Sequence, residues 1–152
     1  MISRYDSLMA RVTSTFIAPA IQVYAFYVIA HGHYSPGGGF QGGVMLAAST
    51  VLLRFVLGSE EGYRRFPPRR AALFGALGVL CFALIGTVPL LRGGAFLDYG
   101  MLPIVGAGEA LRRYIGILLV EVSIGFAVWG SLVVIFDALT APGNGADEGG
   151  RS

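Results

Sequence analysis

Glu121 is the residue of this chain whose type and position most clearly indicate chemistry. It stands in the run Ile-Leu-Leu-Val-Glu-Val-Ser-Ile-Gly and is the one carboxylate placed inside a predicted membrane span. A central carboxylate in a span costs about 2.5–3.5 kcal/mol on insertion scales. Two interpretations follow: a way-station for a proton or cation, or a structural carboxylate bonded to a neighbouring helix or another protein of a complex.

His31 and His33 are the next candidates. Imidazole titrates near neutral pH, so it can relay protons or bind a metal ion. Two histidines at i, i+2 with no cysteine or carboxylate beside them make a poor metal site, and we expect none. The pair is interpreted either as interfacial residues that cap a helix end or bond a loop, or as a proton relay.

The depth of Glu121 suggests partners for it. At about 1.5 Å per residue it lies roughly 10 Å below the outer end of a helix that begins near Tyr114. The same depth on the other predicted helices predicts a polar layer with Tyr24, Ser49 and Thr87, if the helix faces match. The ion-pathway candidates are therefore Glu121, His31, His33, Tyr24, Ser49 and Thr87.

Catalysis by the chain itself is not expected. Every basic residue is Arg, which removes lysine chemistry, and the single cysteine, Cys81, lies within an apolar run. No Ser/His/Asp or Cys/His arrangement is present, and the glycine-rich stretch lacks the GK[ST] of a phosphate-binding loop. We expect no catalytic residue and no cofactor.

The composition defines the class of protein. The chain has 152 residues, of which 55% are hydrophobic and 13% charged, with a mean hydropathy of +0.68. Soluble domains carry about a quarter charged residues, so this is an integral membrane protein. The formal charge of +2 is too small to indicate a nucleic-acid partner.

The apolar runs predict an all-α fold with four transmembrane helices, at about 12–30, 40–57, 71–91 and 114–136. We expect a polar arm over 1–11, a membrane domain over 1–140 and a mobile polar tail over 141–152. Residues 58–70 read as a loop, because Pro67 and Pro68 end any helix there. The middle of the outer loop, 96–105, is apolar enough to pack back on the helices.

Arginine placement predicts the topology. With the N-terminus inside, the cytoplasmic segments hold Arg4, Arg11, Arg54, Arg64, Arg65, Arg69, Arg70 and Arg151, whereas the outer loops hold Arg92, Arg112 and Arg113. This bias favours cytoplasmic N- and C-termini. Arg54 lies near a span end, where its side chain is expected to reach the interface. Asp98, Glu109, Asp137, Glu60 and Glu61 are expected to be solvated or paired with nearby arginines.

The glycine-rich stretch between the first two spans predicts close helix packing. Gly39, Gly43 and Ala47 recur every four residues, so they share one helix face on which a neighbouring helix can approach. The residues expected to shape the turn and this face are Pro36, Gly37, Gly38, Gly39, Phe40, Gly42, Gly43 and Ala47.

This stretch also carries a family resemblance. Gly-His-Tyr-Ser-Pro-Gly-Gly-Gly-Phe-Gln-Gly-Gly, residues 32–43, resembles the GH-x-x-PGGGF-x-GG signature of the MnhB family, whose members are small subunits of Mrp-type Na+/H+ antiporters. The four-span layout and the run from Glu121 to Gly125 extend the resemblance over most of the chain.

The resemblance implies a non-enzymatic accessory subunit of a multisubunit monovalent cation (Na+)/proton antiporter in the cell inner (plasma) membrane. Its partners would be larger antiporter-like subunits and membrane lipids, with Na+ and H+ as the transported ions. Two alternatives stay open: a membrane-arm subunit of a related hydrogenase or respiratory redox complex, and a purely structural scaffold.

Overall fold

The computed structural model describes residues 4–32, 37–106 and 108–140, and these residues form helices without a β-strand. In chain order the elements are α1 (Arg4–Ala30), α2 (Gly38–Leu57), α3 (Ser59–Arg65), α4 (Pro68–Leu91), the short 3-10 helix η1 (Tyr99–Met101) and α5 (Glu109–Thr140). Within the described residues, α1, α2, α4 and α5 are the four helices long and apolar enough to cross a membrane. The predicted all-α fold with four spanning helices is confirmed. The tail predicted over 141–152 lies outside the described residues.

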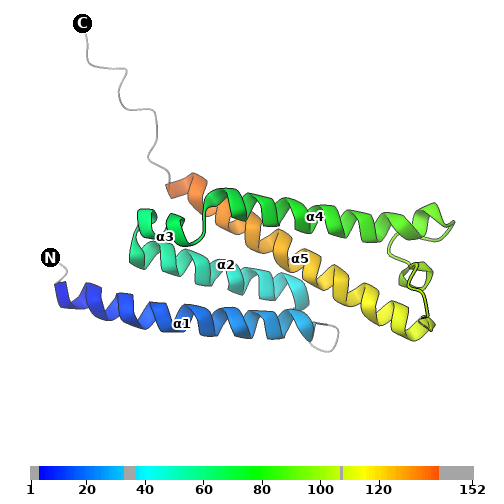
Figure 1. Ribbon diagram of the computed structural model, residues 1–152, viewed down its shortest axis with the longest axis horizontal. Coiled ribbons are helices and arrows are strands. Elements are labelled where there is room, and N and C mark those ends of the chain that lie inside the picture. The colour runs from blue at the N-terminus through cyan, green and yellow to red at the C-terminus, as the bar shows by residue number, and fades with distance from the viewer. Residues whose placement is uncertain (1–3, 33–36, 107, 141–152) are drawn as a thin grey trace, which may run out of the picture.

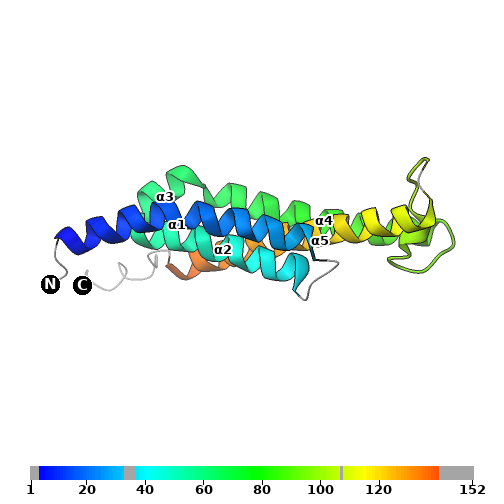
Figure 2. The same cartoon turned by 90° about the horizontal axis from the view of Figure 1, so that it is seen from below.

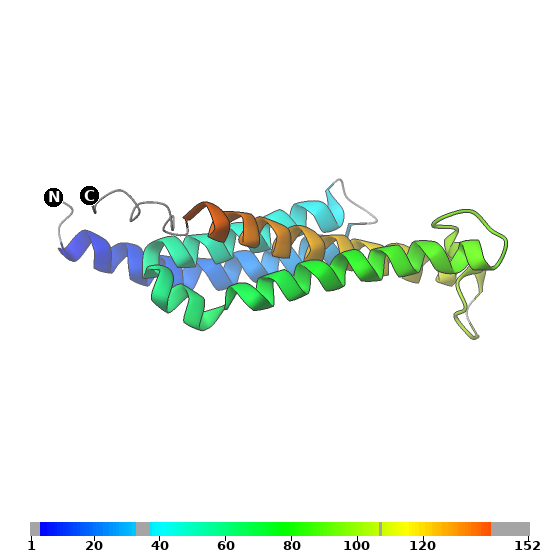
Figure 3. The same cartoon turned by 90° about the horizontal axis from the view of Figure 1, so that it is seen from above.

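The four long helices lie in a row in the order α1, α2, α5, α4 (Figure 1). α2 packs against α1 on one side and α5 on the other, and α4 packs mainly against α5. α2 and α5 run in the same direction, because Gly39 meets Glu121 near one end and Arg54 meets Asp137 near the other. The first turn of α1 and the last turn of α5 lie at the same end of the row as α3 (Figures 1 and 3).

A row leaves both broad faces of the helices uncovered. The share of each spanning window buried inside the chain ranges from 22% for α4, at an edge of the row, to 39% for α2 in the middle. The small core consists of two clusters, Ala25, Ile29 and Leu46 in one and Ala47, Ala71 and Val133 in the other, with Trp129 packed against both. Most of the apolar surface therefore faces outward.

Several helices extend beyond the spans predicted for them. α1 begins at Arg4, so most of the expected polar arm is helical. α5 begins at Glu109, five residues before Tyr114, and continues four residues past Phe136. The segment predicted as the loop 58–70 contains α3. Its second proline, Pro68, starts α4, because a proline in the first helical turn loses no hydrogen bond.

The α4–α5 hairpin extends past the C-terminal end of α1 and the N-terminal end of α2 (Figures 1 and 2). Glu121 contacts Gly39 at the start of α2. Because α5 begins twelve residues before Glu121, at Glu109, about 18 Å of α5 lies beyond this contact. The connection between α4 and α5 packs back on this hairpin, as predicted. Phe96 makes an edge contact with Phe82 at 6.2 Å, and the side chains of Tyr99 and Leu102 cover Gly116.

Candidate functional site

The carboxylate of Glu121 meets the N-terminus of α2. Glu121 is half-buried on α5, and its Oε2 accepts a hydrogen bond from the backbone N–H of Gly39, the second residue of α2. The first N–H groups of a helix have no partner within it, and this end of the helix dipole is positive. Glu121 thus caps α2 from a different helix, with a full negative charge placed where the helix favours one.

Glycine is required at the two positions of α2 that contact this carboxylate, Gly38 and Gly39. Gly38 has φ +43°, and a Cβ there would collide with the carboxyl group of Glu121. A Cβ on Gly39 would collide with the backbone carbonyl oxygen of Glu121. The glycine-rich motif and Glu121, which are 82 residues apart in sequence, therefore form one structural unit.

The small-residue face of α2 continues this contact toward the other end of the row. A Cβ on Gly43 would meet the carbonyl oxygen of Gly125 and the side chain of Val128, both on α5. Ala47, one turn further, is buried beside Val133. Gly39, Gly43 and Ala47 therefore lie against α5, and Gly42, on another face, lies against Ile29 of α1.

Tyr99 of η1 is electrostatically coupled to Glu121. Burial raises the pKa of the Tyr99 phenol above its ordinary value, and the negative charge of Glu121 raises it further. The phenol therefore stays protonated and neutral at any physiological pH. The connection between α4 and α5 thus supplies a neutral hydroxyl within electrostatic reach of the carboxylate.

The predicted polar layer around Glu121 is not formed. Ser49 is buried, but its hydroxyl donates to the carbonyl of Leu46. It lies ten residues past Gly39 on α2, about 15 Å from the level of Glu121. The Thr87 hydroxyl is exposed and donates to the carbonyl of Ala83. The prediction placed Glu121 too close to the outer end of α5, because it started that helix at Tyr114.

The aromatic residues near the C-terminal end of α1 stack along one face. Tyr24 is 56% exposed and its ring lies 6.1 Å from that of Tyr27, which in turn stacks on His31 at 4.2 Å. The Nδ1 of His31 is 3.0 Å from the Tyr27 carbonyl oxygen, so an Nδ1–H tautomer donates there. His33 and Pro36 lie outside the described residues.

Of the remaining motif residues, Gly37 has φ +114° just before α2, and Phe40 is 64% exposed. Phe40 therefore projects away from the α2–α5 contact. Within the described part of the chain, no group of three or more His, Cys, Asp or Glu residues could hold a metal ion.

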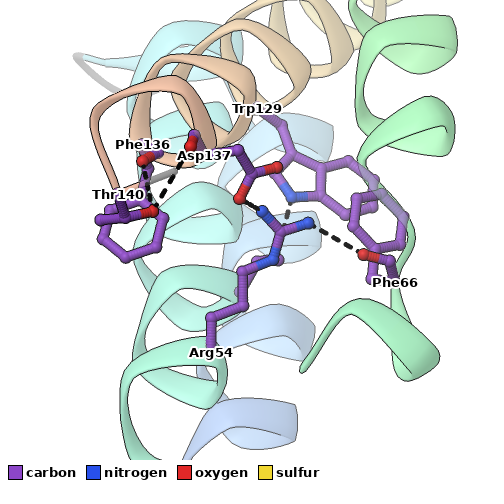
Figure 4. A network of polar contacts seen from close by, with 7 residues as sticks. Arg54, Phe66, Trp129, Phe136, Asp137 and Thr140 are labelled. Atoms are coloured by element: carbon purple, nitrogen blue, oxygen red, sulfur yellow. Dashed lines mark hydrogen bonds and ion pairs between the residues drawn. The ribbon is translucent and has the colours of Figure 1, made fainter. Parts of the chain in front are cut away.

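Asp137 forms an ion pair with an arginine at the opposite end of the α2–α5 contact, which is one of its two expected states, but the sequence analysis did not identify Arg54 as its partner. Arg54 is only 3% exposed and donates to the carboxylate of Asp137 and, at 2.8 Å, to the Phe66 carbonyl (Figure 4). Its guanidinium carbon lies 5.0 Å from the centre of the Tyr63 ring, so α3 covers it. The Arg54 side chain does not extend outward to the interface as expected, because it is buried against Asp137, which is itself buried in α5.

A sequence signal for this pair existed. Arg54 lies three residues before the end of α2 at Leu57, and Asp137 lies three residues before the end of α5 at Thr140. Opposite charges at matching depth in two apolar helices indicate a pair once the helices are neighbours.

Aromatic and hydroxyl groups pack around the pair. The indole Nε1–H of Trp129 donates to the Thr50 hydroxyl at 3.0 Å, and that hydroxyl donates to the Leu46 carbonyl at 2.9 Å. The Trp129 ring stacks on Phe66 at 5.0 Å and on Phe74 at 5.5 Å.

The fold and these two contacts define a multi-pass α-helical membrane protein with an open row of spanning helices. The chain belongs to the family described as "Domain related to MnhB subunit of Na+/H+ antiporter", whose model matches residues 9–134. It is similar to proteins named "Putative antiporter subunit mnhB2" from Staphylococcus aureus strains Newman, JH1 and Mu3. Each is 27% identical over 151 residues, covering 97% of this chain and 98% of the relative.

Proposed function

We propose that this chain is an accessory subunit of a multisubunit monovalent cation (Na+)/proton antiporter in the cell inner (plasma) membrane. The observation that carries the proposal is the family match over residues 9–134, with relatives that align along nearly their whole length. The chain acts by packing against larger antiporter-like subunits, which carry the main ion route, and it contributes no catalytic group of its own.

The open row of helices supports packing against partners. α4 lies at an edge of the row, contacts mainly α5, and has only 22% of its spanning window buried. Large apolar side chains such as Leu73, Leu77 and Val79 are each more than two-fifths exposed. In a large complex, partner helices cover part of this surface and lipid covers the rest.

The orientation we propose places the end with α3 in the cytoplasm. Arg64 and Arg65 of α3 lie at this end, as do Arg69 and Arg70 in the first turn of α4. The described ends of α1 and α5 lie there as well (Figure 3). The excess of arginine on cytoplasmic loops then puts both termini inside.

We assign Glu121 a positioning role within this protein. Its carboxylate holds the N-terminus of α2 against α5, so the glycine-rich segment keeps one arrangement in the assembled complex. The alternative is that Glu121 flanks an ion path. It is favoured by one observation: the group is half-buried, with the neutral Tyr99 phenol in electrostatic reach.

Co-purification tests the proposed assembly. The tagged full-length chain, extracted from its native membrane in mild detergent, is expected to bring down larger antiporter-like subunits. Vesicles that contain this complex are expected to exchange Na+ for H+, and those prepared from a strain lacking the chain are expected to lose the exchange. Co-purification with hydrogenase or quinone-linked subunits instead, or full exchange without the chain, would contradict the proposal.

A further inference from the structure

A cavity of about 250 Å³ lies between α1, α2, α3 and the Trp129 side chain of α5. It is separate from the Glu121 site, which is at the other end of α2. The lining residues that matter most for what it could bind are Phe26, Leu46, Thr50, Arg54, Arg65 and Trp129. Along α2 it reaches from Leu46 to Arg54, which is about 12 Å of helix.

The end of this cavity near α3 has two arginines, Arg54 and Arg65. Arg54 is buried and already paired with Asp137, and within this pair the Arg54 Nε–H and the Asp137 Oδ2 have no partner among the described residues. The Arg65 side chain is 49% exposed and is paired with Glu61 at 3.4 Å. Arg65 is therefore the cation at this end that an anionic group can reach.

Apart from Gln22 and Thr50, the rest of the cavity is lined by apolar side chains. Phe26, Leu46 and Leu53 line it together with the rings of Phe66 and Trp129. Phe26 is half-exposed on α1, so the apolar wall continues onto a surface that faces the membrane. A free inorganic anion would leave this wall uncovered, whereas an amphiphile covers both parts.

We propose that this cavity binds one anionic phospholipid, with its phosphate at Arg65 and the start of an acyl chain along Phe26, Leu46 and Trp129. At about 30 Å³ per water, the volume corresponds to roughly eight waters, which is enough for a phosphate and its glycerol. The charged end is three residues from the end of α2, the depth at which lipid headgroups lie. Basic pockets between spanning helices are typical sites for such headgroups.

The exposed arginines nearby draw anionic lipid toward the cavity. Arg64, Arg69 and Arg70 are exposed, and the structure gives them no ion pair within the described residues. Surface charge alone would concentrate anionic lipid here without a specific site. The test must therefore separate a cavity arginine from a neighbouring surface arginine.

Trp129 is the sole tryptophan of the chain and lines the cavity, so its fluorescence reports on an occupant. The purified full-length chain is reconstituted in phosphatidylcholine vesicles that contain brominated phosphatidylglycerol or, separately, brominated phosphatidylcholine. We expect brominated phosphatidylglycerol to reach half-maximal quenching of the Trp129 fluorescence at a mole fraction at least threefold lower than brominated phosphatidylcholine does. Millimolar inorganic phosphate is expected to leave this difference unchanged.

Arg65→Ala and Arg64→Ala form the matched pair of variants. Both remove one positive charge from α3, but only Arg65 lines the cavity. We expect Arg65→Ala to bring the ratio of the two mole fractions close to one and Arg64→Ala to retain it. Equal quenching by the two lipids would overturn the proposal, as would equal effects of the two variants. If millimolar phosphate abolished the preference for phosphatidylglycerol, the cavity would be a site for free phosphate, and the lipid proposal would be wrong.

Discussion

The two ends of the α2–α5 contact use a carboxylate in different ways. At one end, Glu121 accepts a hydrogen bond from the backbone of Gly39, and the positive end of a helix dipole balances its charge. At the other end, Asp137 meets the full positive charge of Arg54, which also bonds the Phe66 carbonyl. Glu121 is half-buried, whereas both partners of the ion pair are buried.

The comparison relates the burial of each carboxylate to the size of the positive charge that it faces. A helix N-terminus supplies only a partial positive charge, and Glu121, which faces one, is only half-buried. A guanidinium supplies a full charge, and Asp137 can be enclosed beneath α3. Removing one partner should therefore cost much more at the Arg54 end, because a full charge would stay buried alone.

The largest effect is expected for Asp137→Ala. This change leaves the guanidinium of Arg54 buried without its carboxylate, which costs about 3–5 kcal/mol. We expect little folded chain in detergent, measured by size-exclusion chromatography of a fluorescently tagged protein. The double variant Arg54→Met with Asp137→Leu removes both charges and should recover most of the folded yield. If the folded yield of the double variant stayed as low as that of Asp137→Ala, the unpaired buried charge would not be the cause of the loss.

The next largest effect is expected for Gly43→Leu. The added side chain has no room between α2 and the Gly125 carbonyl of α5, and overpacking of this kind costs about 1–3 kcal/mol. The apparent melting temperature in detergent should fall. Ala48→Leu is the control, because Ala48 is exposed on α2. Equal losses from both variants would contradict close α2–α5 packing.

A smaller effect is expected for Thr50→Val, which removes the acceptor for the Trp129 indole at 3.0 Å. Hydrogen bonds between membrane helices contribute about 0.6 kcal/mol on average. The melting temperature should drop slightly, and the Trp129 emission should shift as its N–H loses a partner. An unchanged emission spectrum would mean that the bond is absent in the membrane.

The smallest effect concerns the titration of Tyr99. Because the Glu121 charge is the second of two causes that raise the pKa of Tyr99, Glu121→Gln should lower that pKa, with burial still holding it above its ordinary value. The measurement is the pH dependence of the labelled tyrosine ring carbons in NMR, with Tyr99→Phe to assign the signal. A pKa that stays the same or rises in Glu121→Gln would contradict the coupling.

Apolar run length was enough to predict the four spanning helices, since a membrane demands about twenty apolar residues for each crossing. The helix ends were harder to place, because polar residues such as Arg4 and Glu109 continue the helix past the apolar run. α3 was missed because its seven residues, with glutamates and arginines, carry no apolar period.

The sequence singled out Glu121 but not its partner. A lone carboxylate in an apolar helix is visible in the sequence, whereas its contact with Gly39 depends on which helices are neighbours and how they are staggered. The Arg54–Asp137 pair joins residues 83 apart for the same reason. The depth count that grouped Ser49 with Glu121 was wrong because it assumed helices that start at one level.

The positioning role of Glu121 is tested most sharply by comparing Glu121→Gln with Glu121→Ala in the assembled complex. The glutamine oxygen can still accept the hydrogen bond from Gly39, but the alanine cannot. Na+/H+ exchange by vesicles, normalised to the amount of intact complex, should stay close to the wild type for Glu121→Gln, since the lost charge–dipole term of about 0.3–1 kcal/mol acts on the stability of the α2–α5 contact. Glu121→Ala should reduce the amount of intact complex. Intact complexes of Glu121→Gln that exchange no Na+ would contradict the positioning role and place Glu121 on the ion route.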